Sequence, residues 1–195
     1  VMMWLEEDNV DGLRFDSTVN IRNASGTDVP EGWWLLQAIN DRVDAQYSGR
    51  IMIAEDLQGD AWLTKATGEG GAGFDAQWDG GFFHPIHAVL VAPEDGQRSM
   101  TVVAEALRGG AAGAPFTRVV YTENHDEVAN GKQRLPVMIA PNDPAGYHAR
   151  KRSMLGAALV LTAPAIPMLF QGQEFLEDGY FRDDDPLDWS RAQTF

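Results

Sequence analysis

Short apolar stretches alternate along the chain with amphipathic ones, and this alternation predicts parallel strands joined by helices, an α/β architecture. The segment Arg50–Ala54 is apolar in its middle, as expected of a strand that is covered on both faces. In Trp33–Tyr47 the side chains of Leu36, Ile39 and Val43 recur at helical spacing. The predicted elements are a strand ending near Phe15, the helix Trp33–Tyr47, the strands Arg50–Ala54 and Ala72–Trp78, the helix Ser99–Arg108, the strand Thr117–Thr122, a helix from Asp143 to about Leu161, and the strand Ala165–Phe170.

Two of the helices carry signals that set their expected positions. Asp143 followed by Pro144 is typical of an N-cap and a first helical residue, so a helix is expected to begin there. The segment Ser99–Arg108 has apolar side chains at helical spacing, and four of them are expected to face inward, namely Met100, Val103, Ala104 and Leu107. Together the elements make five strand–helix units.

Three of the predicted strands end in a carboxylate. Asp16 closes the segment that begins at Asp11, Glu55 follows Arg50–Ala54, and Asp126 follows the strand that ends near Thr122. Barrel enzymes collect catalytic groups in this way, one from each of several strand ends on a single face. Two carboxylates that flank a sugar–oxygen bond are the smallest set of catalytic groups that can cleave a glycoside. The pattern therefore indicates carbohydrate chemistry.

The neighbours of these carboxylates suggest different tasks. Arg14 is two residues before Asp16, so both side chains are expected on one side of the strand, where the guanidinium lowers the pKa of the carboxyl group. Glu55 follows four apolar residues, and dry surroundings raise the pKa of a carboxyl group. The adjacent Asp56 is expected to oppose ionisation of Glu55 where the two lie close. A structural Arg–Asp pair and a carboxylate at the barrel rim are the alternatives for these motifs.

His125 and Asp126 form a third polar motif, for which a capped turn is the alternative interpretation. Three other patterns resemble ligand-binding motifs, but each lacks part of the required pattern, so no ligand is expected at any of them. Gly68–Gly73 satisfies the dinucleotide-binding glycine pattern but lacks a preceding apolar strand, so a loop is expected. His84 and His87 lack a carboxylate at ligand spacing. Asp183–Asp185 lacks the glycine turn of a calcium loop and is expected to be a solvated acidic loop.

Composition mainly excludes partners. The 195 residues include 29 acidic and 15 basic ones, a formal charge of −14, which argues against nucleic acid because phosphate backbones require clustered Lys and Arg. The absence of cysteine removes disulfides, a thiolate nucleophile and cysteine metal sites. The longest apolar run, Met154–Phe170, is interrupted by glycine and proline, which is too broken for a membrane span. We expect no cofactor, no metal and no membrane partner.

The three acidic motifs in this order resemble those of the alpha-amylase superfamily of retaining glycoside hydrolases and transglycosidases. The resemblance implies that Asp16 is the nucleophile, with Arg14 beside it, and that Glu55 is the general acid/base. It further implies that Asp126 stabilises the transition state and that His125 contacts the sugar. The implied substrate is an α-glucan such as glycogen, starch or a maltooligosaccharide.

The resemblance covers nearly the whole chain and implies strands four to eight of a (β/α)8 barrel, whose full length is about 250 residues. Residues 1–195 are therefore expected to be the C-terminal part of a catalytic barrel, incomplete at both ends and inactive alone. Met168–Phe175 and Pro186–Trp189 look most like glycogen branching enzymes, which favours branching and a cytoplasmic location. An α-amylase-type hydrolase, a trehalose-forming relative and a non-catalytic glucan-binding barrel are the alternatives.

Overall fold

A computed structural model describes residues 1–109 and 114–195. The chain divides into two compact units. Unit 1 comprises Val1–Gly80 and Gly109–Val119, and unit 2 comprises Gly81–Arg108 and Val120–Phe195. Each unit has a hydrophobic cluster of its own. Each is described by itself below.

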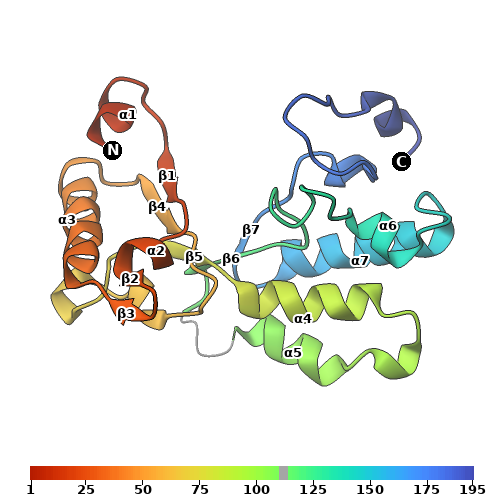
Figure 1. Cartoon of the computed structure of the whole chain (residues 1–195), viewed down its shortest axis with the longest axis horizontal. Coiled ribbons are helices and arrows are strands. Elements are labelled where there is room, and N and C mark those ends of the chain that lie inside the picture. Colours follow the sequence, from red (N-terminus) through yellow and green to blue (C-terminus); the bar gives the residue numbers. More distant parts are fainter. Residues whose placement is uncertain (110–113) are drawn as a thin grey trace. The chain divides into compact units, whose positions relative to one another are not determined.

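The parallel sheet confirms the predicted α/β fold. Its strands follow one another in the order β1-β4-β5-β6-β7 (Figure 1). In unit 1, Phe15 pairs with Ala54, Ile53 with Ala76, and Gln77 with Arg118, all in parallel register. In unit 2, the Met168 N–H donates to the Val120 carbonyl at 2.9 Å, next to β7. The strands span Gly12–Phe15 (β1), Ile51–Ala54 (β4), Ala76–Trp78 (β5), Arg118–Val120 (β6) and Ile166–Pro167 (β7).

Unit 1 is built around the long helix α3, Pro30–Gln46, whose buried face includes Leu36 and Val43. These side chains share a cluster with Met52 and Ala54 of β4, so the helix covers one face of the strands. The helix begins three residues before the predicted start because Pro30 occupies its first turn, where proline is favoured. The other elements are α1 (Met2–Glu6), α2 (Val19–Arg22), a hairpin of β2 (Asn23–Ala24) and β3 (Thr27–Asp28), and the 3-10 helices η1 (Ala61–Thr64) and η2 (Thr67–Glu69).

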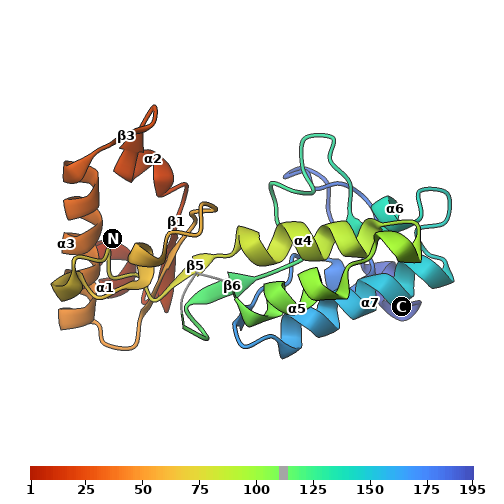
Figure 2. The same ribbon diagram turned by 90° about the horizontal axis from the view of Figure 1, so that it is seen from below.

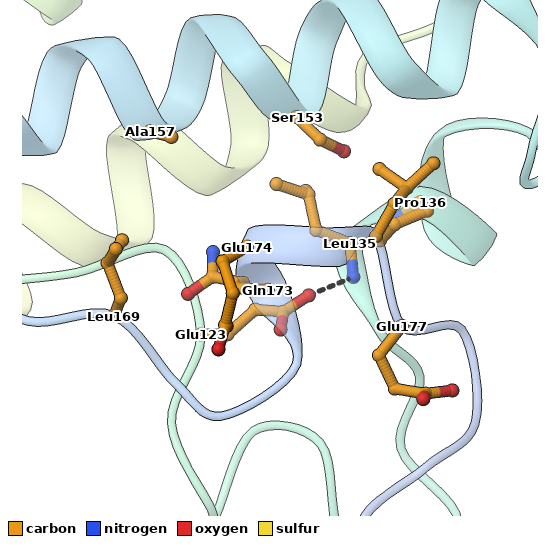
Figure 3. A pocket seen from close by; sticks show the side chains of 10 residues that line it. Glu123, Leu135, Pro136, Ser153, Ala157, Leu169, Gln173, Glu174 and Glu177 are labelled. Atoms are coloured by element: carbon orange, nitrogen blue, oxygen red, sulfur yellow. Dashed lines mark hydrogen bonds between the residues drawn. The ribbon is translucent and has the colours of Figure 1, made fainter. Parts of the chain in front are cut away.

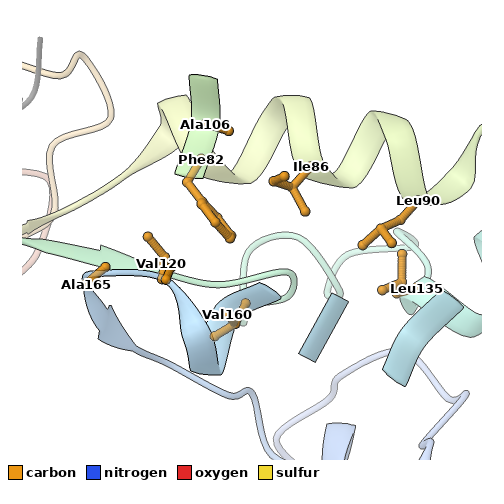
Figure 4. Close-up of a cluster of buried hydrophobic side chains, with 9 residues drawn as sticks. Phe82, Ile86, Leu90, Ala106, Val120, Leu135, Val160 and Ala165 are labelled. Atoms are coloured by element: carbon orange, nitrogen blue, oxygen red, sulfur yellow. The ribbon is translucent and has the colours of Figure 1, made fainter. Parts of the chain in front are cut away.

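Unit 2 is mostly helical, and its apolar cluster lies between α4, α5, α7, Val120 of β6 and Ala165, which directly precedes β7 (Figure 4). Phe82 and Ile86 of α4 are fully buried there, as is Val160 of α7. The elements are α4 (Gly80–Val91), η3 (Asp95–Gln97), α5 (Met100–Arg108), α6 (Leu135–Ile139), α7 (Tyr147–Thr162), η4 (Gln173–Phe175) and η5 (Trp189–Gln193).

Several helix predictions differ from the structure. Helix α4 was not predicted, because its two leading glycines and the internal Pro85 are helix-breaking signals. Helix α7 begins at Tyr147 rather than at Asp143, because the Gly146 N–H donates to the Asp143 carbonyl and closes a separate turn. Met100 was expected to face inward, but it is the first residue of α5 and is 61% exposed.

The predicted strand Ala72–Trp78 is shorter, because the N–H groups of Ala72 and Phe74 donate to the carbonyls of Trp62 and Leu63. The last strand is likewise reduced to two residues of the predicted six, Ala165–Phe170. In both segments, local loop hydrogen bonds replace part of the expected ladder.

The close approach of α2 and α3 within unit 1 makes Gly32 a sensitive position (Figure 2). A Cβ atom at Gly32 would lie 1.8 Å from the Ile21 carbonyl oxygen. Gly32→Ala is therefore expected to lower the free energy of unfolding by about 1–3 kcal/mol through overpacking. In a free helix the same change favours the helix by about 1 kcal/mol. Urea unfolding of this variant beside Gly68→Ala, where a Cβ meets no atom, measures the difference. Equal midpoints for the two variants would rule out the close approach.

Candidate active site

Arg14 of β1 joins the two carboxylates that were predicted to be catalytic. Its Nη1 donates to Asp16 Oδ1 at 2.7 Å, and its Nη2 lies 2.6 Å from Glu55 Oε2. The strand register explains the arrangement, because Phe15 and Ala54 pair side by side and each is followed by its acid. The Glu55 N–H donates to the Phe15 carbonyl at 2.9 Å and extends this pairing by one residue. The structure thus brings Arg14, Asp16 and Glu55 together in unit 1.

The three side chains differ in exposure. Asp16 is 77% exposed and Glu55 12%, with Arg14 between them at 28%. The Arg14 guanidinium also lies over the Trp78 ring, 4.5 Å from its centroid, a cation–π contact that orients the arginine. The sequence alone did not identify Trp78 as part of this cluster. Its position at the end of β5, the strand next to β4, is the signal that could have found it.

Glu55 has a second polar contact although only 12% of its side chain is exposed. Besides Arg14, the backbone N–H of Ser17 donates to Glu55 Oε2 at 2.7 Å. Ser17 has a φ of +42°, in the left-handed region that non-glycine residues rarely adopt. Such backbone conformations cost free energy and cluster at functional sites. One cation and one backbone hydrogen-bond donor therefore contact the Glu55 carboxylate.

Asp56 has a structural partner of its own. Its carboxylate is buried and accepts hydrogen bonds from Arg22 Nε at 2.8 Å and from Arg22 Nη2 at 3.2 Å. Thr18 Oγ1 lies 3.4 Å from the same carboxylate. The Asp56 carboxylate is thus engaged by a bidentate guanidinium and has a structural role.

His125 and Asp126 lie in unit 2, with His125 Nε2 3.5 Å from Asp126 Oδ1 and both side chains about half exposed. They line an open groove of about 710 Å³. The opposite wall comes from the segment around Phe181, whose N–H donates to the Val128 carbonyl at 2.7 Å. Arg182 and Asp184 of this wall form an ion pair at 3.0 Å. His125 and Asp126 thus lie in a polar, accessible groove.

A buried ion pair lies in the same loop as His125 and Asp126. Glu123 and Arg134 are each about 2% exposed or less, and Arg134 Nη1 donates to Glu123 Oε2 at 3.1 Å. The other Glu123 oxygen accepts from the Leu135 N–H at 2.6 Å, next to a small cavity of about 40 Å³ (Figure 3). Arg134 also donates to the carbonyls of Gln171 and Gly179. This network fixes the loop to the segment that follows β7. Sequence reasoning missed it, because either residue alone resembles a surface charge.

Burial raises the pKa of Glu123 above its ordinary value of 4.5, and the nearby Glu177 adds to the rise while Arg134 and the Leu135 N–H oppose it. A raised folded-state pKa means that the folded state holds the proton more tightly than the unfolded state. Protonated Glu123 therefore stabilises the folded state. This contribution to the free energy of unfolding is complete below pH 4.5 and is lost as the pH rises through the folded-state pKa of Glu123. Glu123→Gln is therefore expected to flatten the fall in melting temperature above that pH. Glu105→Gln, at an exposed helical position, is the control. Parallel curves of melting temperature against pH for Glu123→Gln and the unaltered protein would contradict the raised pKa of Glu123.

The other candidate motifs are parts of loops or of helices. The glycine-rich segment lies along α3, where the side chains of Trp33, Gln37 and Asn40 donate to the carbonyls of Gly70, Gly71 and Ala72, respectively. Burial lowers the pKa of His87, whose ring centroid lies 5.2 Å from that of Phe83. In the part of the chain that the structure describes, no group of three or more His, Cys, Asp or Glu side chains could hold a metal ion. No helix there combines the length and apolar character that a membrane crossing requires.

Comparison with known proteins gives a consistent result. No protein-family model matches the chain. The 1,4-alpha-glucan branching enzyme GlgB of Rhodococcus jostii is 29% identical over 96% of the chain, and that of Geobacillus stearothermophilus is also 29% identical over 96%. The chain spans 27% and 29% of these relatives, respectively. Among solved structures, a pullulanase from Anoxybacillus sp. LM18-11 complexed with maltotriose has a TM-score of 0.71 at 21% identity, covering the whole chain and 29% of that protein. An Anoxybacillus alpha-amylase has a TM-score of 0.67 at 20% identity over 97% of the chain and 39% of that protein.

The fold is thus similar to part of the alpha-amylase-type barrel of these solved structures. The sequence is similar over almost its whole length to 1,4-alpha-glucan branching enzymes. The predicted family resemblance and fold class are confirmed.

Proposed function

We propose that the natural protein is an α-glucan-active retaining transglycosidase, a 1,4-α-glucan branching enzyme. It cleaves an α-1,4 bond and transfers the released chain to a sugar 6-hydroxyl. Support comes from the sequence similarity to branching enzymes and from the clustered acids in unit 1. The contact that carries most of the proposal is the single guanidinium of Arg14, which binds Asp16 and Glu55 at the same time.

The proposed reaction has two halves. In the first, Asp16 attacks the anomeric carbon while Glu55 gives a proton to the departing oxygen, so that a covalent glycosyl–Asp16 ester replaces the glycosidic bond. In the second, Glu55 takes the proton of the incoming 6-hydroxyl, whose oxygen displaces Asp16 from the anomeric carbon. Asp126 and His125 bind sugar hydroxyls, and Asp126 binds them more strongly in the transition state than in the ground state.

Proximity of the two carboxylates supports this division of roles. Retaining glycosidases hold their two carboxyl groups about 5–5.5 Å apart, close enough for direct attack on the sugar. One planar group lies between the Asp16 and Glu55 oxygens, which keeps the two acids close. In the first half Glu55 must contact the departing oxygen, but here its Oε2 lies 2.6 Å from Arg14 Nη2. We therefore propose that substrate entry breaks the Arg14–Glu55 pair and leaves the Arg14–Asp16 pair intact.

Proton NMR of amylose incubated with the natural protein tests the function. Branching creates α-1,6 anomeric signals without matching new reducing ends. Reducing ends without α-1,6 signals would make the protein an α-amylase-type hydrolase. Conversion to a non-reducing disaccharide would make it a trehalose-forming relative. An unchanged spectrum with a folded protein would favour a non-catalytic glucan-binding barrel.

We also propose that residues 1–195 form strands four to eight of a catalytic (β/α)8 barrel. The share of the branching enzymes that the chain covers, 27–29% for the two relatives above, supports this assignment. A cytoplasmic location is proposed from the same similarity, and fractionation of the source cells tests it.

A further inference from the structure

The groove of about 710 Å³ that contains His125 and Asp126 has two walls, which come from distant parts of the sequence of unit 2. One wall is the loop that carries these two side chains, and the other is the segment 180–184. The walls meet where Phe181 pairs with Ala129 in an isolated parallel bridge. Such a bridge joins two loops at a single point, so the width of the groove also depends on contacts farther from it.

The guanidinium of Arg134 supplies contacts of this kind to both walls. Its Nη1 donates to Glu123 Oε2 at 3.1 Å, two residues before His125. Its Nε donates to the carbonyl of Gly179 at 3.0 Å, directly before the second wall. Nη1 also donates to the Gln171 carbonyl at 2.9 Å. One rigid planar group therefore joins the residues at which the two walls begin.

The first wall passes from the core to the solvent within a few residues. Glu123 is 2% exposed, whereas the side chains of His125 and Asp126 are 43% and 57% exposed. Besides the bond from Arg134, the Glu123 carboxylate accepts one from the Leu135 N–H at 2.6 Å (Figure 3). The two exposed side chains therefore take their position from a buried neighbour that is held at both of its oxygens.

The second wall is connected to the same arginine. The Arg134 guanidinium lies over the Phe170 ring, 4.9 Å from its centroid. The Phe170 ring in turn contacts the Phe181 ring edge-on, with 5.4 Å between the centroids. The Gly179 N–H donates to the Glu177 carboxylate at 3.0 Å, so the residue bound by Arg134 is itself fixed. Both the start of this wall and a side chain within it are thus linked to Arg134.

The cost of burying these charges shows what the ion pair contributes. The side chains of Arg134 and Glu123 are 1% and 2% exposed. Taking two charges out of water costs about as much free energy as their mutual attraction returns, and apolar residues of similar volume often give equal stability. A guanidinium differs from such residues in its fixed fork of donors, which holds several acceptors in one geometry. The contribution of Arg134 is therefore mainly geometric.

We propose that Arg134 is a positioning residue that, through Glu123 and Gly179, sets the placement of His125 and Asp126 relative to the opposite wall of the groove. The proposal rests on the proposed function, in which Asp126 binds sugar hydroxyls most strongly in the transition state. Arg134 does not line the groove, so it acts through the side chains that do. Displacing a group that acts mainly in the transition state lowers kcat and changes KM little.

Steady-state kinetics of Arg134→Lys on amylose, made in the natural protein, test the proposal. Lysine keeps a positive charge beside Glu123 but lacks the fork that holds the two carbonyls. We expect kcat to fall about tenfold, with KM changed by less than about twofold. Arg152→Lys is the matched control, because Arg152 Nη1 also donates to two carbonyls of unit 2, those of Leu90 and Ala92, and does not line the groove. This control should keep the kcat of the unaltered protein.

A double-mutant cycle separates positioning from a general structural role. Arg134→Lys is made in the unaltered protein and in an Asp126→Ala background, and turnover of α-maltosyl fluoride is measured, since its good leaving group keeps the residual rate measurable. We expect a much smaller effect in the Asp126→Ala background, because the side chain that Arg134 positions has been removed. Equal factors in the two backgrounds would overturn the proposal.

Hydrogen exchange gives a further readout that needs no activity. The Phe181 N–H donates to the Val128 carbonyl across the two walls, so its exchange reports how well they are held together. Arg134→Lys is expected to speed this exchange about tenfold, and Arg152→Lys is expected to leave it unchanged. Melting checks that each variant is folded. If Arg134→Lys is unfolded, Glu123→Leu/Arg134→Met takes its place, because it removes both buried charges and leaves neither unpaired.

The outcomes separate this proposal from the proposed function. An unaltered protein that branches amylose, together with a folded Arg134 variant of unchanged kcat, would overturn the positioning role and leave the proposed function standing. Unchanged exchange at Phe181 in that variant would also overturn the positioning role. An unaltered protein that does not rearrange amylose would overturn both.

Discussion

Asp16→Asn is expected to remove nearly all turnover of α-glucan by the natural protein, by a factor of about 10⁴ or more, while glucan binding is retained. Losing a covalent nucleophile removes the reaction path itself, and such substitutions cost several orders of magnitude in kcat. The change from carboxylate to amide keeps the shape of the side chain and removes its charge. Because Asp16 is 77% exposed, the folded structure should tolerate the change with little loss of stability. Initial rates on amylose measure the turnover, and the glycogen affinity of the same preparation measures the glucan binding.

Asp95→Asn is the matched control for this substitution. Asp95 is also strongly exposed and also forms an ion pair with an arginine, Arg98, but it is not one of the predicted catalytic acids. Its variant is expected to keep the turnover of the unaltered protein. Comparable turnover in Asp16→Asn would show that the nucleophile has been assigned to the wrong residue.

Arg14→Ala is expected to lower kcat by about 10²–10³, the range found when one preorganised electrostatic group is removed from an active site. In the first half of the reaction, Arg14 orients Asp16, and the Trp78 ring supports the guanidinium. Without it, Asp16 and Glu55 face each other with no cation between them. Arg14→Lys should recover only part of the rate, since an ammonium group cannot contact two carboxylates with the fixed geometry of a guanidinium. Steady-state kinetics on amylose measure both variants.

Arg50→Ala separates this role from a general loss of stability. Arg50 is 23% exposed and forms an ion pair with Asp11 in the same unit, so its environment is similar to that of Arg14. Both alanine variants should lower the melting temperature by similar, modest amounts. Only Arg14→Ala should lower kcat. Equal kcat values for the two variants would restrict Arg14 to a structural role.

The sequence predicted the ends of β1 and β4 well because residue type is most constrained there. Parallel strands that are covered on both faces need apolar residues up to the edge of the sheet, and a polar residue marks the edge. The positions of Asp16 and Glu55 at the ends of β1 and β4 follow from this rule. The pairing of Arg14 with Asp16 follows from side-chain alternation along one strand.

Features that depend on contacts between distant segments could not be predicted in the same way. Glu55 follows a run of apolar residues, yet its partners come from Arg14 and Ser17, about 40 residues earlier in the chain. The Glu123–Arg134 pair is buried because two further segments cover it. Neither environment has a signal in the local pattern of polar and apolar residues. Helix α4 was missed for the opposite reason, since its local glycine and proline signals are overridden by packing in the core of unit 2.

Trapping of the glycosyl–enzyme intermediate tests the central claim most directly. The natural protein would be incubated with a fluorinated maltosyl fluoride that forms the covalent intermediate but hydrolyses slowly, then digested and mapped by mass spectrometry. The account predicts one added glycosyl group on the peptide that contains Asp16, with fragmentation placing it on that carboxylate. An adduct on Glu55 or Asp126, or turnover of the trap without any adduct, would contradict the account.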